Sequence, residues 1–170
     1  MPGSPEDRPI PGPSGSPPRA PRAGDGPGTV LHVDARLDAC AEVRAFVRGR
    51  AAELGADETA TTDLVQAVDE WVTNVVVHGY RGSPGPVDVE LERDAASIIV
   101  RVSDLAPVFD PGVAPRFDPS VPLERRRLGG MGIYLMRDLM DSIEHRPLPG
   151  GGNEVTMRRH RRTPARRGSG

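Results

Sequence analysis

The chain has 170 residues, which is enough for one domain with a buried core and additional tails. Its formal net charge of -2 at pH 7 argues against nucleic acid as a direct partner. The single cysteine, Cys40, excludes an internal disulfide, and no apolar run reaches membrane-spanning length, so we expect a cytoplasmic protein.

The two ends of the chain differ in composition from its middle. Residues 1–28 hold nine of the 19 prolines, interleaved with glycine and serine, and few apolar side chains. Such a segment cannot bury enough surface to offset the entropy lost on ordering, so we expect a disordered leader. Arginines crowd the C-terminus, and we expect a basic disordered tail at residues 159–170. One domain at residues 29–158 is therefore predicted.

Hydrophobic periodicity in the first half of this domain predicts a strand, two amphipathic helices and a β-hairpin. The strands are expected at residues 29–33, 87–91 and 97–102, and the helices at residues 37–54 and 63–80. The first helix is predicted to bury Cys40, Val43, Val47, Ala51 and Leu54. Asp57 or Thr61 would cap the second helix, because either side chain can accept a hydrogen bond from a free backbone N–H group.

A long irregular stretch at residues 105–130 follows the hairpin. It contains five prolines, and a loop of this length inside a compact domain is usually functional, so we expect a lid over a binding site. Beyond the lid, the pattern predicts a helix at residues 133–140 and two closing strands at residues 142–146 and 154–158.

The second helix carries the most informative polar residues. Glu70, Asn74 and His78 stand four residues apart and form a polar stripe beside an apolar arc. A carboxylate can take up a proton, and an amide oxygen can hold a hard metal ion. In isolation, the pattern is more typical of a solvated helix face. The apolar arc consists of Leu64, Val68, Trp71, Val72 and Val75.

Two further features suit a nucleotide ligand. Gly129, Gly130 and Gly132 surround Met131 at the start of the third helix, so backbone N–H groups can approach an anion there. Three arginines directly upstream would neutralise negative charge, although short glycine clusters also serve as hinges. Asp104, at the end of a strand, would either accept a hydrogen bond from an adenine amino group or be an ordinary turn residue.

The order of these features is more specific than any one of them. Glu70-x-x-x-Asn74, then Asp104, an irregular loop and glycines opening a helix, resembles the histidine-kinase-like ATPases, the GHKL superfamily. Within it, EWVTNVVVHGY and LGGMGIYLMRDLMDSIEH are similar to the bacterial anti-sigma-factor serine kinases. The resemblance covers residues 29–158 and implies an α/β (α+β) two-layer sandwich, the Bergerat-type fold. Helices would cover one side of a mixed, mostly antiparallel sheet, with ATP between them and the lid.

The resemblance also implies roles for individual residues. Asn74 would coordinate Mg²⁺, and Glu70 would be the catalytic base that takes the proton from a substrate serine. Asp104 would bind adenine, and His78 matches a family position near the nucleotide. The phosphates would be lined by Gly129, Gly130, Met131 and Gly132.

The loop after Asp104 departs from the D-x-G-x-G pattern that is frequent in the family. Ala106 replaces the first glycine, and its methyl group is tolerated if this residue does not need a positive φ. Phe109 still matches the D-x-G-x-P-F-D-P form of the anti-sigma relatives, and we expect both residues beside the nucleotide. Asn153, with Thr156 three residues on, is the nearest match to a strand threonine that helps to hold adenine in relatives.

By the same resemblance, the protein is expected to be an ATP-dependent serine-protein kinase that phosphorylates a STAS-domain anti-anti-sigma protein. It would also sequester an RNA polymerase sigma factor, as a homodimer, with no membrane partner. Arg44 matches the spacing of a partner-facing arginine but is equally consistent with a solvated helix residue. The altered loop favours an alternative, a nucleotide-binding regulator without phosphotransfer, which the intact Glu70 opposes. A generic nucleotide hydrolase is a third hypothesis.

Overall fold

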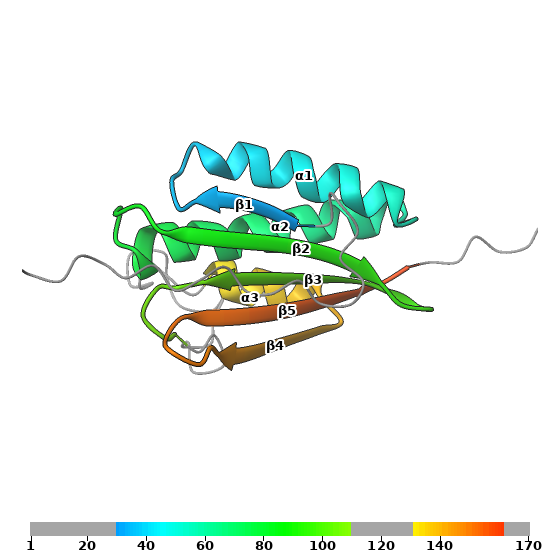
Figure 1. The fold of residues 1–170 in the computed structure, drawn as a ribbon. Helices are drawn as coiled ribbons and strands as arrows, with labels where there is room; N and C mark the ends of the chain where they lie inside the picture. The colour runs from blue at the N-terminus through cyan, green and yellow to red at the C-terminus, as the bar shows by residue number, and fades with distance from the viewer. Residues whose placement is uncertain (1–29, 110–130, 162–170) are drawn as a thin grey trace, which may run out of the picture.

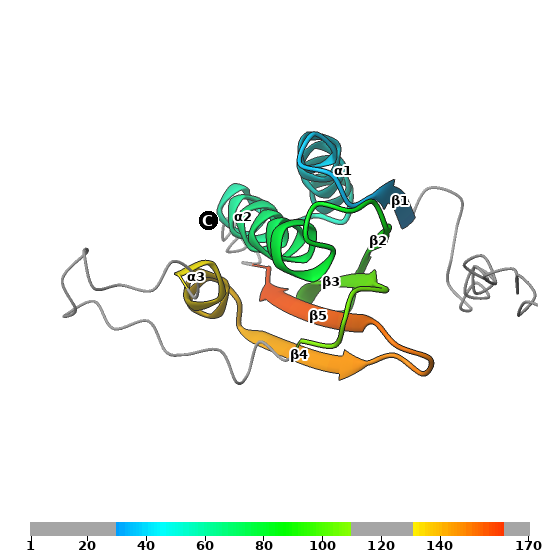
Figure 2. The same cartoon turned by 90° about the vertical axis from the view of Figure 1, so that its left-hand side faces the viewer.

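The computed structural model describes residues 30–109 and 131–161, and these residues form two layers (Figures 1 and 2). Figure 2 shows the three α-helices on one side of the sheet. The chain runs through β1 (Val30–Asp34), α1 (Ala39–Glu53), α2 (Glu58–Asn74), a π-helical turn η1 (Val75–Gly79), β2 (Pro86–Arg93), β3 (Ser97–Asp104), α3 (Met131–Leu139), β4 (Ser142–Pro147) and β5 (Asn153–His160).

The sheet has the strand order β1-β2-β3-β5-β4, and all four of its pairings are antiparallel. The expected α+β sandwich is present, but in the described residues its sheet is antiparallel throughout and not mixed. The reason is that β5 lies between β3 and β4 and runs opposite to both. Asp104 closes β3 and stands opposite Val87 of β2 and Asn153 of β5, so these residues meet at one end of the sheet.

The core lies between the helices and the inner face of the sheet. The predicted arc of α2 is buried, and Trp71 is 1% exposed, so a Trp71→Ala change would cost about 3–5 kcal/mol. The predicted face of α1 is also buried, with Leu54 partly covered. The sheet contributes alternating side chains, as its period of two requires. These are Val87, Val89, Leu91, Ile98, Val100, Val102, Val155 and Met157.

The second helix begins directly after the residue that caps it. The Asp57 side chain accepts a hydrogen bond from the Ala60 N–H group at 2.9 Å, which confirms one of the two expected caps. Thr61, the other candidate, lies inside the helix and is buried. The helix therefore starts at Glu58, five residues before the expected position 63. The cap at Asp57 allows residues 58–62 to form its first turn.

The last strand continues to His160, two residues beyond its expected end at position 158. Arg159 forms ion pairs with Asp63 of α2 at 2.8 Å and with Asp141 at 3.4 Å. The His160 N–H group donates to Asp141 at 2.7 Å. These contacts fix the first residues of the expected tail in the sheet. Residues 162–170 of the tail, the leader and residues 110–130 of the expected lid lie outside the described residues.

Within the described residues, no helix has the length and apolar character needed to cross a membrane.

Candidate functional site

Glu70 and Asn74 of α2 meet the first turn of α3. A Cβ atom added to Gly132 would lie 2.3 Å from Glu70 Oε2 and 3.6 Å from Asn74 Nδ2. The absence of a side chain at Gly132 therefore lets the start of α3 approach both polar groups. A helix start carries unpaired N–H groups and a partial positive charge, so this place suits an anion.

Asn74 is partly buried, and its Nδ2 atom is itself buried and has no hydrogen-bond partner. A buried polar group without a partner costs about 1–3 kcal/mol, so a ligand that pairs with this amide would recover that energy. The amide can also present its oxygen after a half-turn of its plane. Unlike its neighbours on the apolar arc of α2, the Asn74 side chain can therefore offer a hydrogen-bond donor or an oxygen to a ligand.

The donor set around Asn74 fits Mg²⁺ better than a metal held by the protein alone. Among the described residues, no group of three or more His, Cys, Asp or Glu side chains is arranged around a common point. Mg²⁺ typically uses one or two protein oxygens and completes its shell with phosphate oxygens and water. An Asn74 oxygen next to a helix start that suits an anion is compatible with that mode.

His78 does not continue the line through Glu70 and Asn74. The α-helix ends at Asn74, and η1 follows with a bond from the Tyr80 N–H group to the Val75 carbonyl at 2.8 Å. This i to i+5 spacing widens the turn, so a residue four positions on is displaced around the axis. His78 is exposed within η1, and its place near the nucleotide stays a prediction.

Asp104 is buried at the end of β3 and keeps one carboxylate oxygen without a partner. Its Oδ1 atom accepts bonds from Asn153 Nδ2 at 2.8 Å and from the Ala106 N–H group at 2.9 Å, while Oδ2 has none. Burial raises the pKa of Asp104, and these two hydrogen bonds and the nearby His145 partly oppose that rise. The unpaired Oδ2 can accept a bond from a ligand amino group.

Asn153 connects Asp104 to the start of the loop that follows it. Its Oδ1 atom accepts bonds from the Phe109 N–H group at 2.9 Å and from His145 Nε2 at 3.0 Å. The structure therefore places Asn153 beside Asp104, and its contact with adenine stays a prediction. Thr156 is different: it lies an odd number of residues away and projects from the opposite face of β5, so the structure does not bring it to this site.

Ala106 occupies its position without backbone strain. Among described non-glycine residues, only Arg81 has a positive φ, so Ala106 does not need the conformation that favours glycine. Its methyl group is buried against Gly79, where an added Cβ would lie 2.8 Å from that of Ala106. A missing side chain on η1 thus makes room for the extra methyl group on the loop.

Phe109 ties the same loop to α2. Its ring stacks on the buried ring of Trp71, with centroids 6.3 Å apart and an angle of 30° between the planes. Trp71 is the residue next to Glu70. The loop after Asp104 is therefore joined to α2 by a direct aromatic contact, one residue beyond Glu70.

Comparison with known proteins agrees with this geometry. The model of the histidine kinase-like ATPase domain matches residues 33–159. The chain belongs to this family. A serine-protein kinase RsbW of Listeria monocytogenes is 32% identical over 121 residues, covering 68% of this chain and 76% of the relative. An anti-sigma F factor of a Thermoanaerobacter species is 29% identical over 120 residues, covering 69% and 82%.

A solved structure supports the fold of this ATPase domain. It contains the RsbU and RsbW domains of a Mycobacterium tuberculosis protein and matches with a TM-score of 0.52 at 26% identity. The match covers 79% of this chain and 33% of the solved chain, so this chain spans about a third of the length of the solved protein. The expected family and fold class are confirmed.

The remaining expectations for the ATPase domain differ in outcome. Gly129 and Gly130 lie outside the described residues, and of Met131 only the backbone at the start of α3 is described. Arg44 of α1 is partly exposed and forms an ion pair with Asp69 at 2.7 Å. This contact gives Arg44 a structural role, and its role toward a partner stays a prediction.

Three residues of the site were given no role from the sequence. Gly79 faces Ala106, Gly152 packs under the backbone of Asp104, and Tyr80 bonds to the residue after Asp104. Gly79 and Tyr80 belong to the HGY end of the quoted motif, and Gly152 belongs to a run of three glycines. Only the pairing of β3 with its neighbours, which the sequence does not specify, brings the three together.

Proposed function

We propose that this protein is an ATP-dependent serine-protein kinase and anti-sigma factor. It would phosphorylate a STAS-type anti-anti-sigma antagonist and sequester an RNA polymerase sigma factor, and it would act in the cytoplasm. The observation that carries the kinase activity is the contact of Gly132 with both Glu70 and Asn74. It sets a carboxylate and an unpaired amide at the start of one helix. The names of the relatives support the choice of substrate and partner.

The chain's own groups would bind the nucleotide at its two ends. Asp104 Oδ2 would accept a hydrogen bond from the adenine amino group, and the first turn of α3 would face the phosphates. Asn74 would be the protein ligand of Mg²⁺, which neutralises phosphate charge when it is bound. Trp71 and Phe109 keep these two ends at a fixed separation through their stacked rings.

Glu70 would act on the substrate serine. In the transfer, the serine oxygen forms a bond to the γ-phosphorus, its proton passes to the Glu70 carboxylate, and the bond to the β-phosphate oxygen breaks to release ADP. Glu70 is only partly buried in α2, against the start of α3. A positioned base of this kind contributes about 10²–10⁴-fold to the rate.

The alternative is a regulator that binds nucleotide without transferring phosphate. The altered loop at Ala106 was the reason for it. That reason is weaker in the structure, because Ala106 has an unstrained backbone and its methyl group fits against Gly79. Glu70 has no function in such a regulator, so its place against Gly132 favours the kinase.

The partner surface proposed here is α1 around Arg44. Arg44 is 44% exposed and its guanidinium pairs with Asp69, the residue that precedes Glu70. A protein docked on Arg44 would therefore lie close to the catalytic end of α2. We also propose a homodimer, as in the sequence-based expectation, and size-exclusion chromatography with light scattering would test it.

The test of the kinase is transfer of labelled phosphate from ATP to a purified STAS-domain protein encoded next to this chain. Glu70→Gln should retain nucleotide affinity by calorimetry and lower transfer by on the order of 10²-fold or more. Glu58→Gln is the matched control, because Glu58 is exposed in the first turn of the same helix. An equal loss of nucleotide binding in Glu70→Gln would remove Glu70 from the base role. Binding of ATP with no transfer by the wild type would favour the regulator.

A further inference from the structure

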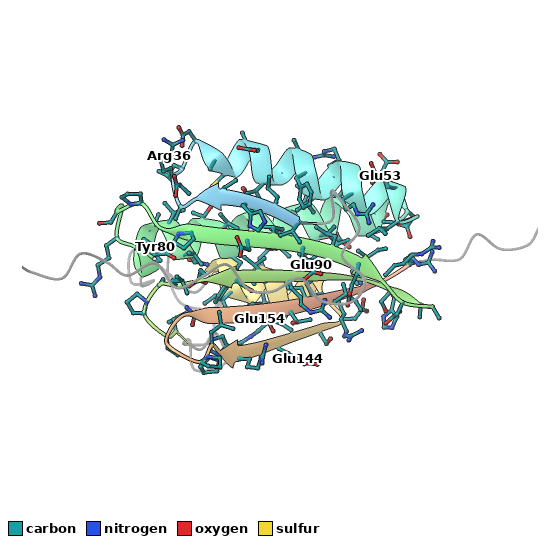
Figure 3. The ribbon with its side chains drawn as sticks, in the orientation of Figure 1. Arg36, Glu53, Tyr80, Glu90, Glu144 and Glu154 are labelled. Carbon is teal, nitrogen blue, oxygen red and sulfur yellow. The ribbon has the colours of Figure 1, made fainter. Side chains whose placement is uncertain are left out.

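The hydroxyl group of Tyr80 bridges two strands at the nucleotide end of the sheet. It donates a hydrogen bond to the Pro86 carbonyl at 2.9 Å and accepts one from the Leu105 N–H group at 2.8 Å. Pro86 begins β2, and Leu105 is the residue directly after Asp104. Figure 3 shows Tyr80 at this end of β2.

The register of the two strands explains what this bridge does. The pairing of β2 with β3 ends with Val87 opposite Asp104, so the next pair in register would be Pro86 and Leu105. At that point the hydroxyl group of Tyr80 stands between the carbonyl and the N–H group that a continued ladder would join directly. The ladder stops there, and the chain turns from β3 into the loop that holds Ala106 and reaches Asn153.

Tyr80 is held firmly in this position. Its ring lies across Gly85, where an added Cβ would be 2.1 Å from a ring carbon. Its backbone N–H group closes η1 by bonding to the Val75 carbonyl at 2.8 Å. Burial, and then the charges of Asp104 and Asp88, raise the pKa of Tyr80 to about 12, while the bond from Leu105 lowers it. The hydroxyl group therefore keeps its proton and can donate and accept at the same time.

We infer that Tyr80 is a positioning residue for adenine recognition, acting through Leu105 on Asp104. By ending the β2–β3 ladder one residue after Asp104, its hydroxyl group fixes the direction in which the Asp104 side chain presents Oδ2. This inference rests on the proposed nucleotide site. It goes beyond that proposal because it assigns part of the discrimination for adenine to a residue that does not touch the base.

The experiment compares Tyr80→Phe with the wild type in binding ATP, inosine triphosphate and inorganic triphosphate, each with Mg²⁺. Inosine triphosphate has a carbonyl group in place of the amino group that Asp104 would bind. We expect Tyr80→Phe to weaken ATP binding by about tenfold, which is the effect of one ordinary hydrogen bond. The preference for ATP over inosine triphosphate should fall by a similar factor, and the affinity for inorganic triphosphate should not change.

Tyr134→Phe is the matched control, because Tyr134 is the only other tyrosine and is 45% exposed on α3. It should leave the preference for ATP unchanged. If Tyr80→Phe only lowered the stability of the protein, it would weaken the binding of all three ligands equally. That result would overturn the inference. An unchanged preference for ATP in that variant would overturn it as well. If the wild type bound no ATP, the proposed function would fail together with the inference.

A second measurement uses the wild-type chain and does not depend on how Tyr80→Phe folds. Hydrogen exchange of the Leu105 amide, followed by nuclear magnetic resonance, reports on the bond to the Tyr80 hydroxyl group. Binding of ATP should slow exchange at Leu105 by about tenfold if the bridge tightens with adenine bound. Binding of inorganic triphosphate should not. Equal protection by the two ligands would contradict the inference.

Discussion

Gly132 of α3 stands so close to Glu70 of α2 that a single added carbon would meet the carboxylate. The Cβ of an alanine there would lie 2.3 Å from Glu70 Oε2 and 3.2 Å from its Cδ atom. The atoms that it meets belong to the far end of a flexible side chain and not to the backbone. The overlap can therefore be relieved by rotation of Glu70, at little cost to the fold but at the expense of the carboxylate's position.

A Gly132→Ala variant should consequently separate stability from activity. We expect its free energy of unfolding to stay within about 1 kcal/mol of the wild type, since alanine is the better helix residue. Phosphotransfer should fall on the order of 10²-fold, which is a typical effect of displacing a catalytic group by about 1 Å. Urea denaturation and the labelled-phosphate assay provide the two numbers.

Gly49→Ala is the control for this variant. Gly49 lies within α1, and an added Cβ there would meet nothing within 4 Å. It should gain roughly 0.5–1 kcal/mol of stability and keep full activity. Full activity of Gly132→Ala would show that Glu70 can work from another position and would count against its role as the base.

Asn74→Ala should abolish measurable binding of Mg-ATP. The change removes the one protein ligand proposed for the metal. Its effect on stability should be small, because the buried Nδ2 atom that it deletes has no hydrogen-bond partner in the protein. The free energy of unfolding should therefore not decrease by more than about 1 kcal/mol, in contrast to the usual loss of a buried polar group. Calorimetry with and without Mg²⁺ measures the affinity.

Gln66→Ala removes an exposed amide from the same helix and should change neither quantity. The single tryptophan, Trp71, follows Glu70 in the sequence and stacks on Phe109, so it gives a fluorescence signal for the same titration. If Asn74→Ala still bound ATP with an affinity that depends on Mg²⁺, the metal would have to be held by a residue other than Asn74.

Local patterns in the sequence were sufficient to predict most of the elements and their buried faces. The arc of α2 and the hairpin follow from periods of about 3.6 and 2, which depend only on neighbouring residues. The family motif then singled out Glu70, Asn74 and Asp104, and the structure places the first two against α3 and Asp104 at the end of β3. The π-helical turn after Asn74 was not predictable, because its residues also fit an α-helix.

Contacts between distant segments could not be predicted. Thr156 was named by its resemblance to a strand threonine of relatives, but the alternation of side chains along β5 places it on the face opposite to Asn153. The fit of Ala106 against Gly79 depends on η1 and the loop lying side by side, as does the bridge at Tyr80. Such features arise from the meeting of surfaces and leave no periodic signal in either segment.

Gly152→Ala should disrupt the adenine end of the site. Gly152 has a φ of +100°, and an added Cβ would lie 2.2 Å from the Asp104 carbonyl oxygen and 3.0 Å from Leu105 Cα. These are backbone atoms that cannot rotate away, so β3 and β5 would have to separate. We expect a large loss of stability, together with a loss of ATP affinity, in urea denaturation and calorimetry.

Gly151→Ala isolates the overlap from the cost of the backbone conformation. Gly151 has a φ of +101°, yet an added Cβ there would meet nothing within 4 Å. It should lose only the roughly 1–2 kcal/mol of a left-handed residue and retain ATP binding. Gly152→Ala should lose at least about 2 kcal/mol more, as expected for an overlap with buried backbone. Equal losses of stability in the two variants would mean that the overlap of the added Cβ with the Asp104 backbone does not destabilise the protein.

Asp104→Asn should stabilise the protein without ligand while weakening its binding of ATP. Burial raises the pKa of Asp104 in the folded state, so the folded chain holds this proton more tightly than the unfolded chain. Asp104 therefore favours the fold only below its unfolded pKa of about 3.9, and this contribution is lost as pH rises through the folded value. A neutral asparagine avoids the cost of a buried charge and can still accept bonds from Asn153 and Ala106.

The difference in unfolding free energy between Asp104→Asn and the wild type should thus grow as pH rises above about 4 and be largest near neutrality. ATP affinity should fall by about tenfold or more, because an amide N–H group would replace the acceptor that faces the adenine amino group. Asp94→Asn provides the opposite sign: hydrogen bonds from the Ala96 and Ser97 N–H groups lower the pKa of Asp94, so its removal should destabilise the protein above pH 4. Denaturation at several pH values measures both variants. A destabilised Asp104→Asn at neutral pH would show that the buried carboxylate stabilises the fold and is not held there at a cost for the sake of the ligand.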